Sequence, residues 1–145
     1  MGGDPPRDEV PGSRAPGDGS RLAVLVVDDE PVVRALAARV LTRAGHDVAA
    51  AANGREALRL IADGQFRPAV LVTDIEMPGM TGIELAARVL ALRPAIRIVM
   101  MTGDPERAES ARRHPSIVDR VLLKPIEHDE LVDAVLPVPG SAVTR

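Results

Sequence analysis

The sequence predicts an α/β protein of the doubly wound class, in which helices cover both faces of one parallel sheet. Short apolar segments alternate with segments of helical periodicity five times along the chain, as repeated right-handed crossovers require. The segment 69–72 is continuously apolar and ends at Thr73 and Asp74. Such a segment is typical of a strand that is buried on both faces.

The first two strand–helix units occupy the amino-terminal half. Residues 22–27 form an apolar strand, and Pro31 opens a helix that should end near Ala44, where Gly45 favours termination. Apolar residues at a spacing of four should face the core from this helix; they are Val32, Leu36, Val40, Val33, Ala37 and Leu41. We expect His46, which follows, to lie at the surface.

A weaker, alanine-rich strand is predicted at residues 48–52. Asn53 and Glu56 have the spacing of an N-cap residue and its capping-box partner, so a second helix should begin there. Its inward-facing residues would be Ala57, Leu58 and Ile61, and Gly64 would end it.

The remaining elements follow the central strand. We expect a helix at 82–92, a strand at 96–101, a short polar helix at 105–113, a strand at 121–123 and a final helix around Leu131, Val132 and Val135. Leu85, Val89 and Leu92 share one side of their helix and should face the core. Five strands in a (βα)5 arrangement favour the flavodoxin-like strand order 2-1-3-4-5.

Composition divides the chain into three segments. Residues 1–20 are rich in glycine and proline and carry almost no apolar side chains, so they are predicted to be a disordered leader. Residues 21–137 form the predicted folded domain, and residues 138–145 form a short carboxyl-terminal tail.

The composition also excludes several classes of function. The chain has no cysteine, which excludes disulfides, thiolate catalysis and zinc–sulfur sites. Phe66 is the sole aromatic residue and the net charge is −3, so neither stacking platforms nor a basic surface for nucleic acid is expected. No apolar run approaches the roughly 20 residues that span a bilayer. We therefore predict a soluble, cytoplasmic protein that contacts neither membrane nor nucleic acid.

Polar residues follow four of the five predicted strands. These are Asp28 and Asp29, then Asp74, Thr102 and Lys124, which is the only lysine of the chain. The assumed strand order places them at one edge of the sheet, where three carboxylates would repel one another. The oxygen-only donor set selects a hard cation, Mg²⁺ or Mn²⁺. Such a combination suits phosphoryl transfer to a carboxylate.

Four motifs together resemble the receiver domain of two-component response regulators. They are Leu-Val-Val-Asp-Asp-Glu-Pro at 25–31, Asp-Ile-Glu-Met-Pro-Gly-Met-Thr-Gly at 74–82, Met-Thr-Gly at 101–103 and Leu-Lys-Pro at 123–125. The resemblance covers about residues 21–136.

The resemblance implies a role for each site residue. Asp74 would be the phosphoacceptor, while Asp29 directly, and Asp28 largely through water, would hold Mg²⁺. The backbone carbonyl of Glu76 would be a further ligand. Lys124 would pair with Asp74 or its phosphate, and Thr102 would hydrogen-bond a phosphoryl oxygen. The Lys124–Pro125 bond is expected to be cis, as it usually is in receivers.

Two features of the sequence bear on how such a switch would work. Receivers commonly place an aromatic residue three positions before the lysine, where this chain has Val121, so the usual coupling of threonine and aromatic rotamers cannot operate. Glu76 and Asp104 flank the path of an attacking water. We therefore expect both acidic side chains to change the lifetime of the phosphoryl group.

The resemblance also implies the partners. A histidine kinase or a histidine phosphotransfer protein would donate the phosphoryl group to a stand-alone receiver. The output would be a protein–protein contact through the face formed by the helix at 105–113, the strand at 121–123 and the final helix. A role as a phosphorelay intermediate uses the same chemistry.

Three alternatives remain open on the sequence. A degenerate receiver could bind partners without phosphorylation, and Val121 favours this slightly. An aspartyl-phosphate hydrolase of the haloacid-dehalogenase type would need Asp-x-Asp after the first strand, where this chain has Asp28, Asp29 and Glu30. A flavin-binding module would need a phosphate loop rich in small polar residues and ring-stacking aromatics, and neither occurs.

Overall fold

One parallel sheet organises the protein, as seen in a computed structural model that describes residues 21–137. Its strands are β1 (Ala23–Val27), β2 (Asp47–Ala51), β3 (Val70–Asp74), β4 (Arg97–Thr102) and β5 (Arg120–Leu123). The helices are α1 (Pro31–Arg43), α2 (Gly54–Ala62), α3 (Gly82–Leu92), α4 (Pro105–Arg112) and α5 (His128–Ala134). The predicted leader (1–20) and tail (138–145) lie outside the described residues.

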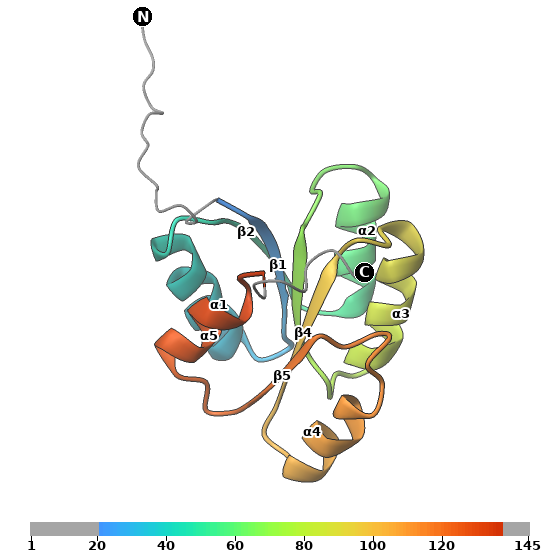
Figure 1. Ribbon diagram of the computed structural model, residues 1–145. Helices are drawn as coiled ribbons and strands as arrows, with labels where there is room; N and C mark the ends of the chain where they lie inside the picture. Colours follow the sequence, from blue (N-terminus) through green and yellow to red (C-terminus); the bar gives the residue numbers. More distant parts are fainter. Residues whose placement is uncertain (1–20, 138–145) are drawn as a thin grey trace, which may run out of the picture.

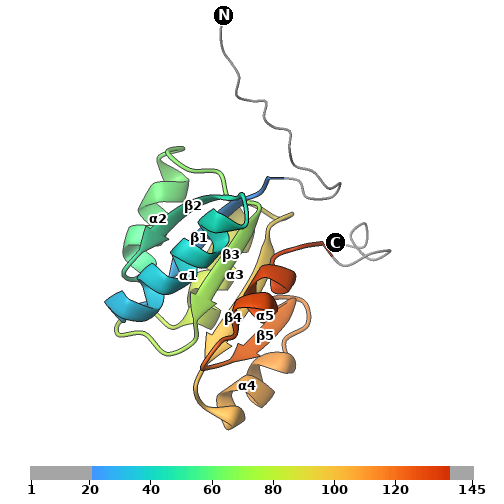
Figure 2. The same ribbon diagram turned by 90° about the vertical axis from the view of Figure 1, so that its left-hand side faces the viewer.

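The strand order is β2-β1-β3-β4-β5, and the paired strands are parallel. Helices α1 and α5 cover one face of the sheet, and α2, α3 and α4 cover the other (Figures 1 and 2). The doubly wound class and the predicted order are therefore confirmed. Strand β3 is buried along its whole length, as its continuous apolar run predicts.

The core has two layers because alternate strand residues face opposite sides of the sheet. On β3, Leu71 packs in the layer under α2 and α3, whereas Val70 and Val72 pack in the layer under α1 and α5. Aliphatic residues and methionines fill both layers, consistent with the near absence of aromatics. Within residues 21–137, no helix has the length and apolarity needed to cross a membrane.

Local sequence signals set most helix ends. Asn53 Oδ1 accepts the backbone N–H of Glu56 at 2.8 Å, as the predicted cap requires. The carboxylate of Glu56, however, accepts from the N–H of Ala52 rather than from that of Asn53. Thr81 and Glu84 form a complete capping box at the start of α3. Gly45 has a φ of +102°, in the left-handed region that a helix terminus favours.

Three predictions of burial were wrong. On α1, Ala37 and Leu41 are buried, but Val32 is 78% exposed and Leu36 is 59% exposed. On α3, Leu92 is half-exposed although Leu85 and Val89 of the same side are fully buried. Val32 and Leu36 line an open groove between α1 and the segment that leads into α5, and Leu92 is the last residue of α3. The errors therefore concern how closely a neighbouring element packs.

His46 is the third error, because it is buried rather than at the surface. Its Nδ1 accepts the backbone N–H of Leu22 at 3.1 Å, so the ring satisfies a donor just before β1. Burial lowers the pKa of His46, although Asp47 acts in the opposite direction. The ring is therefore a neutral structural acceptor.

Candidate phosphoacceptor and metal site

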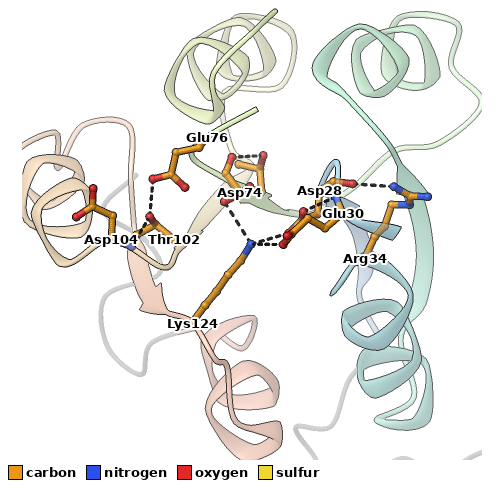
Figure 3. Close-up of polar contacts among 9 residues, drawn as sticks. Asp28, Glu30, Arg34, Asp74, Glu76, Thr102, Asp104 and Lys124 are labelled. Atoms are coloured by element: carbon orange, nitrogen blue, oxygen red, sulfur yellow. Dashed lines mark hydrogen bonds and ion pairs between the residues drawn. The ribbon is translucent and has the colours of Figure 1, made fainter. Parts of the chain in front are cut away.

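The carboxyl ends of β1 and β3 bring three carboxylates together. Asp28 and Asp29 follow β1, and Asp74 is the last residue of β3. Asp28 and Asp74 are buried and Asp29 is exposed, and ligand oxygens from all three lie within 4.8 Å of one another. The structure therefore brings together the three acidic residues that the sequence singled out, of which Figure 3 shows Asp28 and Asp74.

Lys124, at the end of β5, points its ammonium group into this cluster (Figure 3). Its Nζ lies 3.1 Å from Asp28 Oδ2, 3.5 Å from Asp74 Oδ1 and 3.6 Å from Glu30 Oε1. Burial alone would lower the pKa of Lys124, but the hydrogen bond and the charge of Asp28, together with Asp74 and Glu30, raise it above the usual value. The amine is therefore protonated at neutral pH. The Lys124–Pro125 bond is cis, as the resemblance predicted.

Asp28 is held by groups of its own strand–helix connection. Its Oδ1 accepts the backbone N–H of Glu30 at 2.9 Å, and its carbonyl oxygen accepts from Arg34 at 2.8 Å. With Lys124 on the other carboxylate oxygen, both oxygens of Asp28 have partners. This carboxylate is consequently fixed in position before any ligand binds.

Asp74 is held much less completely. Its Oδ1 is the one buried side-chain polar atom among residues 21–137 that accepts no hydrogen bond. Lys124 lies at ion-pair distance from this oxygen but does not form a short hydrogen bond to it. Burial raises the pKa of Asp74 to about 6, Lys124 opposes the rise, and the charges of Asp28 and Glu76 add to it. Asp74 is therefore a buried carboxylate with an unsatisfied acceptor.

The site residues fit a hard divalent cation. A buried carboxylate oxygen without a partner, facing two further carboxylates, is the environment in which a cation would offset the mutual repulsion. Oxygen donors alone favour Mg²⁺ or Mn²⁺ over softer metals. The acidic cluster is thus a candidate metal centre. The predicted role of the Glu76 carbonyl as a ligand stays a prediction.

Thr102 completes the edge of the site from the end of β4. It is fully buried, and its hydroxyl donates to Glu76 Oε2 at 2.7 Å (Figure 3). The same hydroxyl oxygen accepts the N–H of Asp104 at 3.1 Å. Asp104 in turn accepts the N–H of Glu106 and caps α4. Thr102 therefore lies beside the cluster, with its proton occupied by Glu76.

Sequence reasoning missed several contributors to this site. Gly82 begins α3 against the end of β3, where an added Cβ would lie 2.2 Å from the carbonyl oxygen of Asp74. Its presence in the motif at 74–82 was the only signal for this close approach. Glu30 follows the acidic pair directly and Arg34 lies in the first turn of α1, so both could have been suspected. Arg107, which contacts Glu76 from α4, had no signal in the sequence.

Comparison with known proteins identifies the family. The family model described as the response regulator receiver domain matches residues 24–136. The chain belongs to this family of phosphorylation-controlled signalling switches of two-component systems.

Individual relatives agree with this assignment. The chain is 37% identical over 118 residues to the transcriptional regulatory protein TcrA of Mycobacterium tuberculosis, covering 81% of this chain and 46% of TcrA. It is 32% identical over 114 residues to sporulation initiation phosphotransferase F of Bacillus subtilis, covering 77% of this chain and 89% of the relative. The chain therefore spans about half of TcrA but most of the phosphotransferase.

Solved structures show the same fold. The response regulator protein TrrA of Thermotoga maritima, in complex with Mg²⁺ and BeF, superposes with a TM-score of 0.68 at 32% identity. That match covers 79% of this chain and 96% of TrrA. A response regulator of Chloroflexus aurantiacus matches with a TM-score of 0.71 at 33% identity, over 80% of this chain and 95% of the other.

Proposed function

We propose that this chain acts in the cytoplasm as a phosphoacceptor, taking a phosphoryl group onto Asp74 from a histidine kinase or a histidine phosphotransfer protein. The observation that carries the proposal is the buried Asp74 Oδ1, which has no hydrogen bond and faces two carboxylates and an ammonium group. An oxygen with unused lone pairs in a polar pocket is suited to act as a nucleophile.

Each neighbouring group has a role in this transfer. An Asp74 carboxylate oxygen attacks phosphorus, the bond from phosphorus to the donor nitrogen breaks, and its electron pair stays on the departing imidazole. Lys124 donates to the phosphoryl oxygens, and Thr102, at the end of the neighbouring strand β4, offers a hydroxyl proton. Asp28, Asp29 and Asp74 would hold Mg²⁺ or Mn²⁺, which supplies positive charge to the transferring group.

The surface beside the site suits a protein donor. Helix α1 begins two residues after Asp29 and exposes Val32 and Leu36 at its outer side. A groove of about 620 Å³ between α1 and the segment leading into α5 continues this apolar surface, with Leu36 and Ile126 among its lining residues. A donor bound there would lie next to Asp74, so we assign this face to the phosphodonor.

We assign the output, or the next transfer of a relay, to the face formed by α4, β5 and α5. Leu123 of β5 is 41% exposed there, and Arg120 of β5 pairs with Asp133 of α5 at 3.6 Å. This face adjoins the groove that we assign to the donor, because His128 and Leu131 of α5 also line that groove. The similarity to sporulation initiation phosphotransferase F supports the relay use of the same site.

The first test is the intact mass of the protein after incubation with acetyl phosphate. Wild-type protein should gain one phosphoryl group in the presence of Mg²⁺ and none after chelation. Asp74→Asn should abolish the gain, because the nucleophilic oxygen is replaced by an amide nitrogen. Asp63→Asn, at the exposed end of α2, is the matched control and should be labelled like the wild type.

Two results would contradict the proposal. Labelling that survives in Asp74→Asn would mean that another residue accepts the phosphoryl group. No labelling of the wild type by acetyl phosphate or by a panel of autophosphorylated kinases would favour the phosphorylation-independent binding module.

A further inference from the structure

The Thr102 hydroxyl has only one proton, and in the resting structure it donates this proton to a group other than Asp74. The hydroxyl donates to Glu76 Oε2 at 2.7 Å and accepts from the N–H of Asp104 at 3.1 Å. Because Thr102 is fully buried, water cannot easily replace either partner. While Glu76 accepts the Thr102 proton, this proton is not available to a phosphoryl oxygen on Asp74.

Arg107 of α4 holds Glu76 in this position. Its Nε lies 3.0 Å from Glu76 Oε2, the same oxygen that accepts the Thr102 proton. The same Nε lies 3.5 Å from Asp104 Oδ2. One guanidinium therefore joins α4 to the loops that follow both β3 and β4. The outer side of this group borders a hollow of about 340 Å³ lined by Glu76, Arg107 and Thr81, which leaves room for Glu76 to turn away.

We propose that Arg107 is a positioning residue that acts through Glu76 to keep the Thr102 hydroxyl proton away from Asp74. The inference rests on the proposed phosphoacceptor role and adds a contact that opposes it in the resting state. For Thr102 to donate to a phosphoryl oxygen, its bond to Glu76 must break. Glu76 and Asp104 then no longer hold Arg107 as they do in the resting structure. Phosphorylation of Asp74 therefore affects α4 through this hydrogen bond and these ion pairs.

This coupling differs from one that depends on a bulky side chain. Val121 of β5 is a partly buried aliphatic residue packed against the core, and it has no polar group that could follow Thr102. Helix α4 is tied to the rest of the protein by few apolar contacts, since Ala108 and Ala111 are its only buried residues. A polar contact at its first turns can therefore influence its position.

The direction of the effect follows from exposure. The Glu76 side chain is 37% exposed, so without Arg107 it can turn into solvent, where its charge is screened. Thr102 is then released to donate toward Asp74. Loss of Arg107 should therefore favour the phosphorylated form. If Arg107 served mainly to neutralise Glu76, its loss would have the opposite effect.

The test compares Arg107→Gln with Arg112→Gln, a matched variant of the same helix. Arg112 has similar exposure and pairs with Glu109 at 3.5 Å, away from the site. The probe is beryllium fluoride, a phosphoryl mimic, titrated at saturating Mg²⁺. Arg107→Gln should bind it about 2- to 5-fold more tightly, as expected for an ion pair of this exposure, and Arg112→Gln should bind like the wild type.

A double-mutant cycle tests whether Arg107 acts through Glu76. Glu76→Ala should also tighten binding, and adding Arg107→Gln to it should produce no further change. Weaker binding by Arg107→Gln, or an effect that persists in full in the Glu76→Ala background, would overturn the proposal.

A measurement on the resting protein separates this inference from the proposed function. Three-bond couplings to the labelled Thr102 methyl group report its χ1 rotamer. They should show one rotamer in wild type and Arg112→Gln but averaging in Arg107→Gln. Identical couplings in all three proteins would overturn the inference. A wild type that binds no beryllium fluoride would contradict the proposed function, and the rotamer measurement alone would then decide whether Arg107 positions Thr102.

Discussion

The two edges of the sheet use charged residues in opposite ways. At the amino edge, Arg97 donates to the carbonyl oxygens of Ala134, Val135 and Leu136 at the end of α5. Asp119 accepts the N–H of Ile98 at 2.8 Å. These side chains satisfy backbone groups at the end of α5 and near the start of β4.

At the carboxyl edge, three carboxylates face one another and one buried oxygen has no hydrogen bond. Such an arrangement destabilises the fold, because a buried charge without full compensation is costly. The amino edge therefore stabilises the domain, while the carboxyl edge keeps its binding capacity for a ligand. Substitutions at Arg97, Asp74 and Val32 test this difference between the parts of the protein.

The largest effect should come from the amino edge. Arg97→Ala removes the guanidinium that caps α5, leaving its last carbonyl groups without protein donors. We expect a loss of about 3 kcal/mol in the free energy of unfolding, measured by urea denaturation. Arg97→Lys should restore only part of the lost stability, because an ammonium group cannot reproduce the planar, forked geometry of the guanidinium. A loss no larger than that of the exposed variant Arg88→Ala would show that the cap is not needed for stability.

The second effect should have the opposite sign. Asp74 has a pKa of about 6 in the folded protein against 3.8 as its ordinary value. Between these values the native state binds more protons than the unfolded state, so this carboxyl lowers stability as pH rises through the window. Without metal, Asp74→Asn should gain about 2 kcal/mol at pH 7.5, and the gain should decrease through this window and vanish below pH 3.8.

Urea denaturation in chelator at several pH values measures this gain. Saturating Mg²⁺ should shrink it, because binding stabilises the folded wild type. Asp63→Asn serves again as the control, with no pH-dependent difference from wild type. A gain from Asp74→Asn that is constant from pH 4 to pH 8 would contradict the assigned cause.

The smallest effect on stability should come from the exposed side of α1. Val32→Ser should change the free energy of unfolding by less than about 0.5 kcal/mol and leave labelling by acetyl phosphate unchanged. It should slow phosphotransfer from whichever kinase of a panel labels the wild type. Leu92 of α3 is also apolar and is 51% exposed. Leu92→Ser is therefore the matched control and should leave the rate of phosphotransfer unchanged. Equal transfer rates for both variants would remove α1 from the donor surface.

Sequence reasoning placed the acidic cluster correctly because parallel strands end at the same edge. Asp28, Asp74 and Lys124 each lie at the carboxyl end of an apolar strand. Their convergence can therefore be predicted from the strand order alone. The predicted cap at Asn53 and the stop at Gly45 were confirmed for a similar reason, since each depends on neighbouring residues alone. Properties that depend on adjacent residues, or on the order of strands, can be predicted from the chain.

The remaining features required the tertiary structure. Helical periodicity places Val32 and Leu41 on defined sides of α1, but only the packing of α1 against the strands and α5 decides that Leu41 is buried and Val32 is exposed. The ion pair between Arg107 and Glu76 depends on how two loops and the start of α4 meet. The partners of long polar side chains depend on distances and orientations that are set by the packing of the surrounding elements. The chain alone specifies the strands, their order and the polar residues that meet at the carboxyl edge. Tertiary packing sets which proton, charge and apolar surface each of these residues faces.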